Sequence, residues 1–253
     1  MKYLTYGDKS NKAIVLIHGM ATAALTCYEF LIEPLKDYYL VLVEVDGHIP
    51  GEKDSVLKSF PDACTDIERY IQTELDGHVY CIGGLSMGAS MTVEILGRNN
   101  IKADKAFIDG AFIVDLGPVM QRVYRSLFVF FIGWVQKGHK LPDFITDYVY
   151  DKMMGENNRG IIDGLYYDVK KETIKNVCDY VYRYSIRDEI KNYEGDALFI
   201  YGSKEPYARK GAALLKDKLP SLEIREIDDM GHAQYLYDYH AEYERDFLDF
   251  LSR

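Results

Sequence analysis

The sequence predicts an α/β fold built on a mostly parallel, doubly wound sheet. Residues 13–17 are apolar throughout and residues 39–45 are apolar except at Glu44, which is typical of strands that are covered on both faces of a parallel sheet. Segments with helical periodicity separate the apolar runs, so consecutive strands require crossover connections. A glycine-rich turn at residues 83–88 joins one strand directly to a helix. This combination favours a sheet with helices on both faces.

The individual elements follow from the same patterns. Residues 60–75, for example, place Ala63, Ile67, Tyr70 and Ile71 on one face of a helix. In chain order, the expected strands are 2–6 at an edge, 13–17, 39–45, 79–82, 105–108, 197–201 and 222–227, and the expected helices are 26–36, 60–75, 89–96, 207–219 and 241–251.

The alternation of strand and helix stops between residues 112 and 193. This stretch is rich in aromatic residues, reads as mostly helical and contains no good strand. We therefore expect an α/β core formed by residues 1–111 and 194–253, with a helical insertion of residues 112–193. The insertion follows a strand, so it should lie at the carboxyl edge of the sheet, where ligands bind in such folds.

Composition limits the classes of function. A chain of 253 residues suits one domain with an insertion. Its net charge of -10 disfavours nucleic acid or an anionic membrane as the main partner. Residues 1–12 lack the apolar segment of a signal peptide, so we expect a cytoplasmic protein. The cysteines form no C-x-x-C pair and are expected to be free thiols: Cys27, Cys64, Cys81 and Cys178.

The turn after the fourth strand carries a G-x-S-x-G pentapeptide, Gly84 to Gly88. In a strand–turn–helix context this is a nucleophile elbow, which presents a serine hydroxyl above the sheet. Ser86 is then expected to have a strained, positive φ angle. The glycines allow the strand and the helix to approach closely around it. We predict that Ser86 is a catalytic nucleophile.

A serine nucleophile needs a base and an acid. His232 follows the last strand, where a loop carries it over the edge of the sheet, and we predict that it is the base. Glu205 follows the strand before it and preserves the chain order serine, acid, histidine. Asp109 and Asp115 follow an earlier strand and remain alternatives for the acid.

An oxyanion needs two hydrogen-bond donors placed in advance. The backbone N–H of Met87, at the start of the elbow helix, is one candidate. The N–H of Met20, in the loop after residues 13–17, is the other. His18 in this loop is expected to hold the loop in place by hydrogen bonding, without touching substrate.

These motifs together resemble the α/β-hydrolase superfamily. The matching pieces span most of the chain outside the insertion: residues 17–20, 46–48, 84–88, 202–205 and 231–232. Two features depart from the common pattern, namely Glu205 where aspartate is more usual and residues 49–52 in place of Gly-x-Ser. The aspartate nucleophile of epoxide hydrolases and haloalkane dehalogenases is absent, since the position is Ser86.

The resemblance implies a hydrolase whose insertion is a cap. We expect cleavage of a small-to-medium, largely apolar carboxylic ester or thioester through an acyl-enzyme on Ser86, with no metal and no organic cofactor. The alternatives are a ligand-binding receptor or scaffold with slow or vestigial catalysis, and a C–C bond hydrolase. The expected partner is a small-molecule substrate, with no stable membrane insertion, and the protein is expected to be a monomer or a homodimer.

Residues 127–135 form an apolar run within the insertion that is too short to span a bilayer. One interpretation makes it the buried centre of the cap, packed against Tyr148, Val149, Ile161 and Ile162. The other makes it the roof over the nucleophile, with Phe128, Phe131 and Trp134 lining a substrate pocket at helical spacing. Neither interpretation provides a cluster of basic residues beside the run.

Overall fold

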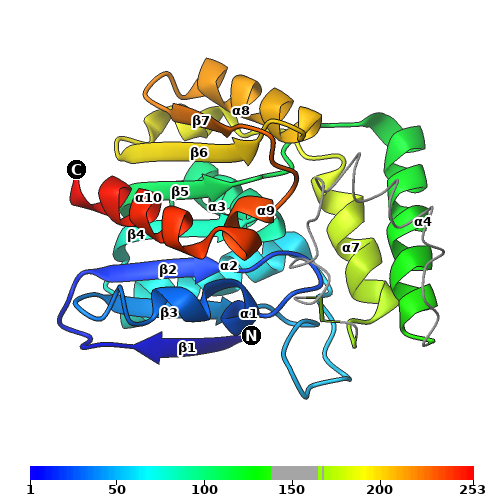
Figure 1. Ribbon diagram of the computed structural model, residues 1–253, viewed down its shortest axis with the longest axis horizontal. Helices are drawn as coiled ribbons and strands as arrows, with labels where there is room; N and C mark the ends of the chain where they lie inside the picture. The colour runs from blue at the N-terminus through cyan, green and yellow to red at the C-terminus, as the bar shows by residue number, and fades with distance from the viewer. Residues whose placement is uncertain (138–164, 167) are drawn as a thin grey trace.

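The computed structural model describes residues 1–137, 165–166 and 168–253. Its centre is a seven-stranded sheet in the order β1-β3-β2-β4-β5-β6-β7 (Figure 1). Only β1 is antiparallel to its neighbour, and all the other pairs in this sheet are parallel. The strands are β1 (Lys2–Tyr6), β2 (Ala13–Ile17), β3 (Tyr39–Glu44), β4 (His78–Leu85), β5 (Lys102–Asp109), β6 (Asp196–Gly202) and β7 (Glu223–Ile227).

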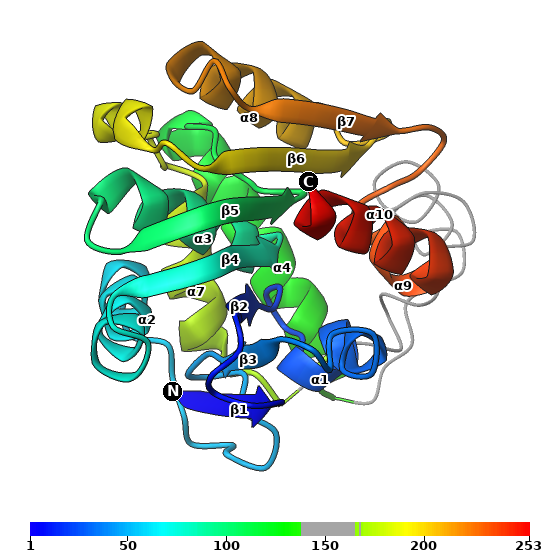
Figure 2. The same ribbon diagram turned by 90° about the vertical axis from the view of Figure 1, so that its left-hand side faces the viewer.

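Helices cover both faces of the sheet (Figure 2). Side chains from α2 (Phe60–Glu74), α3 (Met87–Arg98) and α8 (Pro206–Lys218) share one core cluster with Val15 and Ile17 of β2. Side chains from α1 (Ala24–Tyr28) and α10 (His240–Ser252) share the opposite cluster with Ile14 and Leu16. Successive residues of a strand point to opposite faces, so β2 supplies both clusters. The predicted doubly wound sheet is confirmed.

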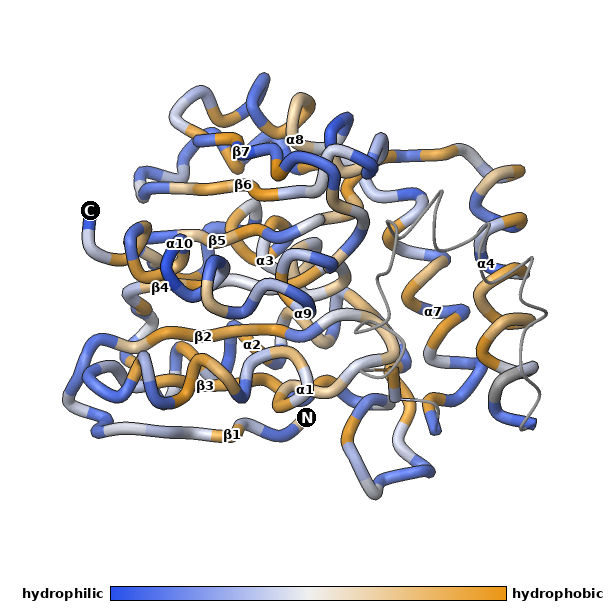
Figure 3. Tube along the Cα trace, viewed as in Figure 1, coloured by the Kyte–Doolittle hydropathy of each residue, from blue (hydrophilic) through white to orange (hydrophobic). Residues whose placement is uncertain are grey.

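The central strands are apolar along their length, as the orange tube of β2 and β3 shows (Figure 3). Residues 14–17 and 40–43 are at most 2% exposed. Burial of such side chains contributes roughly 1.5–3 kcal/mol each, so the strands are anchored over most of their length. The residues that follow them are therefore held in fixed positions at the carboxyl edge.

Some elements differ from those that the sequence predicts. The helix expected at 26–36 is only α1 followed by the 3₁₀ helix η1 (Glu29–Leu31). Pro34 lies in the expected interior, lacks an N–H donor and restricts the residue before it. A short helix, α9 (Gln234–Asp238), has too few residues to show a helical period and was not expected.

Strand β4 continues through its glycines to Leu85, three residues beyond the expected end. The strand stays paired there because glycine has no side chain that would clash with the neighbouring strand. A Cβ on Gly83 would lie 2.6 Å from the carbonyl oxygen of Phe107 in β5. Strand β5 is also longer than expected, since it runs from Lys102 to Asp109 where residues 105–108 were predicted.

The described part of the insertion consists of α4 (Gly117–Val135), α7 (Lys171–Val181) and the 3₁₀ helix η3 (Asp188–Asn192). Helices α4 and α7 lie side by side beyond the carboxyl ends of the parallel strands (Figure 1). The Leu57 N–H donates to the Thr173 hydroxyl over 3.1 Å, and the Asn176 amide donates to the Leu57 carbonyl over 2.9 Å. These bonds join α7 to the core, while the limits 112 and 193 for a separate cap stay a prediction.

The apolar run in α4 is not buried on all sides. Ile132 is 2% exposed, whereas Leu127 is 58% and Phe130 is 62% exposed. The interpretation of the whole run as a buried centre is therefore wrong. Its expected partners Tyr148, Val149, Ile161 and Ile162 lie outside the described residues. No helix in the described ranges is long and apolar enough to cross a bilayer.

The closest backbone approach at the elbow yields a stability prediction. A Cβ on Gly88 in α3 would lie 2.0 Å from the Ile17 carbonyl oxygen, and backbone cannot move away as a side chain can. We expect Gly88→Ala to lower the free energy of unfolding in urea by about 3 kcal/mol, because overpacking outweighs the better helix propensity of alanine.

Gly133→Ala in α4 is the matched control. Its Cβ would meet only the end of the flexible Lys171 side chain, at 2.9 Å. We expect a change within about 1 kcal/mol of the wild type. Equal effects of the two substitutions would contradict the proposed role of the close approach.

Candidate active site

The predicted nucleophile lies on a sharp turn between β4 and α3. Ser86 has φ 54° and ψ -107°, so the expected positive φ angle is confirmed. Its N–H donates to the Asp109 carbonyl over 2.7 Å, and its carbonyl accepts the Ser90 N–H over 2.9 Å. These bonds fix the turn from β5 and from α3. A Cβ on Gly84 would lie 2.5 Å from the backbone of Gly88, so both glycines are required for this approach, as predicted.

The structure brings the three predicted catalytic side chains into one hydrogen-bonded chain. His232 Nε2 lies 2.9 Å from Ser86 Oγ, and His232 Nδ1 lies 2.5 Å from Glu205 Oε2. An ionised carboxylate only accepts, so Nδ1 donates to Glu205 and Nε2 is left to accept from the serine hydroxyl. The other carboxylate oxygen of Glu205 accepts the Gly202 N–H over 2.7 Å.

Each of these residues owes its position to the end of a strand. Ser86 follows β4, Glu205 is three residues beyond β6, and His232 lies in the loop after β7. The Lys204 N–H donates to the Met230 carbonyl over 3.0 Å, which joins the two loops that carry the acid and the base. The carboxyl ends of parallel strands meet at one edge, so residues far apart in sequence become neighbours.

Electrostatics favour a charged imidazole at this position. Burial lowers the pKa of His232, but the charge and the hydrogen bond of Glu205 outweigh burial and raise the pKa above its usual value. Glu205 is 8% exposed, so little solvent screens the pair. The ring can therefore accept a proton from Ser86 and hold it next to the carboxylate.

The two alternative acids occupy different environments. Asp115 is exposed, accepts the Gly117 N–H over 2.7 Å and pairs with Arg183 over 2.8 Å. It is not brought to His232. Asp109 is 4% exposed and lies close enough to Glu205 and His232 for their charges to affect it. Burial first, and then the charge of Glu205, raise the pKa of Asp109 to about 7.

The two candidate oxyanion donors lie on neighbouring strands. Met20 follows β2 and Met87 begins α3 after β4, and Ile17 of β2 pairs with Gly84 of β4. The N terminus of α3 adds positive potential at the second donor. This arrangement is compatible with an oxyanion hole between the two residues.

His18 holds the first of these loops, as expected. Its Nδ1 donates to the Gly19 carbonyl over 2.7 Å, and its Nε2 accepts the Val45 N–H over 3.1 Å. Burial lowers the pKa of His18 to about 4 and, with the neighbouring charge of His18, that of His48 to about 3. Both rings are therefore neutral at neutral pH.

Two supports of this loop escaped the sequence analysis. The Thr22 hydroxyl donates to the Gly19 carbonyl over 2.9 Å, and the Tyr166 N–H donates to the Ala21 carbonyl over 2.6 Å. Ala21 has φ 55°, an uncommon conformation for a residue with a side chain. A threonine three residues after Gly19 is a detectable turn signal. The contact of Tyr166 is made by its backbone and leaves no sequence signal.

The three candidate pocket residues on α4 are not brought together. Phe128 and Phe131 are partly buried and pack against the core cluster that contains Ile132. Trp134 instead lines a cavity of about 390 Å³ around the carboxyl-terminal half of α4. Ser86, Glu205 and His232 are not among the residues that line this cavity. The lining residues are Arg125, Ser126, Val129, Phe130, Gly133, Trp134, Lys137, Lys171 and Lys175.

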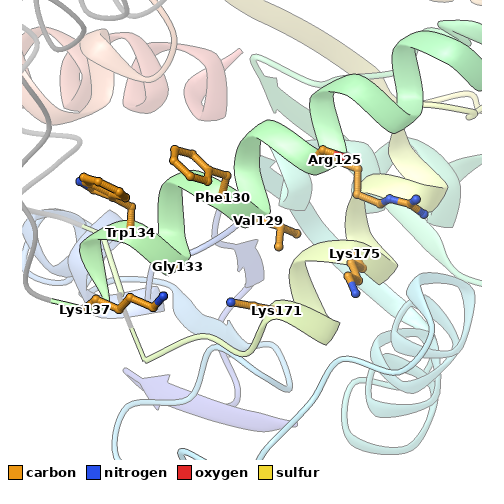
Figure 4. Close-up of a pocket in the computed structure, with 9 residues that line it drawn as sticks. Arg125, Val129, Phe130, Gly133, Trp134, Lys137, Lys171 and Lys175 are labelled. Atoms are coloured by element: carbon orange, nitrogen blue, oxygen red, sulfur yellow. The ribbon is translucent and has the colours of Figure 1, made fainter.

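In Figure 4, Phe130 and Trp134 extend from α4 away from α7, while Lys171 reaches toward Gly133 from α7. The lining therefore includes four basic side chains. The expectation that no basic residues gather beside the apolar run is wrong, because α7 brings lysines from a distant part of the sequence. The role of Phe128, Phe131 and Trp134 in substrate binding stays a prediction.

A mostly parallel sheet with a strained serine between β4 and α3, and with an acid and a histidine after β6 and β7, defines the α/β-hydrolase fold. No protein-family model matches the sequence, and no curated protein matches it.

Solved structures agree with this fold. An α/β-hydrolase family protein from Desulfitobacterium hafniense has a TM-score of 0.80 at 23% identity, over 99% of this chain and 100% of the other. A carboxylesterase from Nitrososphaera gargenis has a TM-score of 0.75 at 14% identity, over 99% and 94%. The enol-lactonase from Burkholderia xenovorans LB400 has a TM-score of 0.74 at 16% identity, over 100% and 96%. At these identities the likeness establishes the fold.

The histidine environments yield a prediction for NMR titration. His232 should titrate above the ordinary pKa of about 6.5, whereas His18 and His48 should stay neutral from pH 5.5 to 8. Glu205→Gln should lower the pKa of His232 and leave the other two rings unchanged, because only His232 contacts that carboxylate. Titration of His18 near pH 6.5 would contradict its assigned burial.

Proposed function

We propose that the protein is a serine hydrolase that cleaves a small-to-medium, largely apolar carboxylic ester or thioester through an acyl-enzyme on Ser86. The observation that carries this proposal is the position of His232, 2.9 Å from the Ser86 hydroxyl and 2.5 Å from the Glu205 carboxylate. A nucleophile, a base and an orienting acid within hydrogen-bond reach are the requirements for acyl transfer.

In the first half-reaction, Ser86 Oγ attacks the carbonyl carbon while His232 Nε2 takes the hydroxyl proton. Glu205 keeps the proton of Nδ1 in place and stabilises the imidazolium. The N–H groups of Met20 and Met87 bind the oxyanion. Collapse of the intermediate breaks the bond to the alcohol or thiol, which receives the proton from Nε2, and leaves the acyl group on Ser86.

In the second half-reaction, water replaces the leaving group. His232 accepts a proton from the water as its oxygen attacks the acyl carbonyl, and the same oxyanion donors act again. Collapse of the second intermediate breaks the bond between the acyl carbon and Ser86 Oγ and releases the carboxylic acid. His232 Nε2 returns its proton to Ser86 Oγ. Every proton therefore moves through one imidazole, whose raised pKa favours the charged intermediate state.

Residues of α4 and two structures with the same fold support the substrate class. The described residues of α4 beyond the carboxyl edge include partly buried Phe128 and Phe131, which favour an apolar acyl group. Two of the structures with the same fold are a carboxylesterase and an enol-lactonase, and a lactone is a cyclic ester. Fold alone does not establish function, so the ester specificity requires a direct test.

A panel of p-nitrophenyl esters and acyl thioesters tests the reaction. We expect turnover by the wild type, and we expect Ser86→Ala to lower kcat by about 10⁴-fold or more, because the acyl group can no longer be carried on the Ser86 oxygen. Ser252→Ala is the control and should leave kcat unchanged, because Ser252 is an exposed serine at the end of α10. A folded wild-type protein that hydrolyses no member of the panel would overturn the proposal, and a binder that returns its ligand unaltered would indicate a receptor.

A chain-length series of acyl esters tests the proposed pocket. We expect Phe131→Ala and Trp134→Ala to shift the preferred chain length, with kcat/KM for the preferred ester falling by roughly tenfold, since one or more methylene contacts are lost. Leu127→Ala is the matched control, because Leu127 is 58% exposed and does not line the cavity beside Trp134. A wild-type preference for charged acyl groups would contradict the apolar pocket. Unchanged chain-length selectivity with reduced stability would show that Phe131 and Trp134 serve in packing and not in substrate binding.

A further inference from the structure

A buried carboxyl group beside the candidate active site has no role in the mechanism above. Asp109 is 4% exposed, and its Oδ2 has no hydrogen-bond partner in the described part of the chain. Buried polar atoms in folded proteins are almost always partnered, so such an oxygen requires an explanation. An apolar or amide side chain would avoid the cost of burying a carboxyl group.

Asp109 lies at the end of β5, one residue before the backbone that approaches His232. It is the last residue of β5 and pairs with Leu85 of β4 and Ile200 of β6. The next residue is Gly110, where a Cβ would lie 3.2 Å from His232 Nδ1 and 3.3 Å from Glu205 Oε2. The backbone directly after β5 therefore lies close to the hydrogen-bonded pair of His232 and Glu205, with no room to spare for a larger residue.

The ionisable groups that interact with the Asp109 carboxyl come from four parts of the fold. Glu205 lies after β6, His232 lies after β7, and the Tyr243 hydroxyl interacts with it from α10. From α1, Tyr28 and Cys27 are influenced by its charge. None of the groups that shift the pKa of Asp109 is a lysine or an arginine. Among the described residues that shift its pKa, the one that can carry a positive charge is His232.

Two neighbouring carboxyl groups that share one cation do not both ionise readily. Burial and the charge of Glu205 raise the pKa of Asp109 to about 7, while the charge of His232 lowers it. Glu205, and not Asp109, has the direct hydrogen bond to the ring. When the Glu205 charge is removed, Asp109 can lose its proton to solvent at a lower pH.

We propose that Asp109 is a positioning residue for His232, a reserve carboxyl group that supplies the counter-charge to the imidazolium when Glu205 carries none. This inference rests on the proposed serine hydrolase function. It predicts that the contributions of Asp109 and Glu205 to catalysis are coupled, because either carboxylate can stabilise the same cation.

The test is a double-mutant cycle on kcat/KM for the best ester of the panel, with wild type, Asp109→Asn, Glu205→Gln and the double variant. We expect Asp109→Asn to lower kcat/KM by less than about fivefold in the wild type and by at least about thirtyfold in Glu205→Gln, since contacting residues show strong coupling. Equal effects in the two backgrounds overturn the proposal. So does a Glu205→Gln variant that is as inactive as Ser86→Ala.

Asp115→Asn is the matched control, since it removes an exposed carboxylate after the same strand. We expect it to change kcat/KM by less than about twofold in both backgrounds. A thirtyfold effect of this control in Glu205→Gln would also overturn the assignment to Asp109.

The pH profile supplies a readout that a structural role would not move. In Glu205→Gln, the acidic limb of kcat/KM should follow ionisation of Asp109. In the double variant the limb should move to lower pH, because His232 has lost both carboxylates that raise its pKa. Coincident limbs in the two variants overturn the proposal.

Tyr243→Phe provides a second route should Asp109→Asn fail to fold. The Tyr243 hydroxyl lowers the pKa of Asp109, so its removal in Glu205→Gln should move the acidic limb to higher pH. An unmoved limb overturns the proposal. An inactive wild type would refute the hydrolase function itself, whereas an active wild type with additive effects would refute only the role of Asp109.

Discussion

The absence of a side chain at Gly88 determines how closely α3 approaches β2, and the geometry around Ser86 depends on that approach. The carbonyl of Ile17 occupies the space where a Cβ would lie, at 2.0 Å, and Gly84 makes the same allowance within the elbow. The serine can then adopt its positive φ angle, with its N–H bonded to the end of β5. Strain of this kind persists only where the surrounding structure fixes it, and here buried strands on both sides do so.

At the candidate site, two carboxyl groups, Glu205 and Asp109, lie near one group that can carry a positive charge, His232. His232 is the group that neutralises Glu205, and the nearby Asp109 carboxyl competes for the same cation. Further away, His18 and His48 are buried and stay neutral, so they add no competing charge near the loop that carries Met20. In the proposed mechanism, proton transfer from Ser86 therefore depends on Glu205, His232 and Asp109 together.

Much of the fold and of the candidate site was predictable from the sequence, because Ser86, Glu205 and His232 each follow a strand and parallel strands end at one edge. Other features depend on contacts that no local pattern records. The bond from Tyr166 to Ala21 joins two backbones that are distant in sequence. Two of the four basic side chains beside α4, Lys171 and Lys175, come from α7. The side of α4 that stays exposed depends on which side α7 covers.

The pH dependence of Ser86 labelling by a fluorophosphonate tests most directly whether His232 activates the serine. The wild-type labelling rate should rise with pH as His232 loses its proton, at a pH above the ordinary histidine pKa of about 6.5. In His232→Ala the rate should fall by about 10²-fold or more and lose that dependence. Equal rates in the two proteins, or the absence of any label on Ser86 in the wild type, would contradict the account.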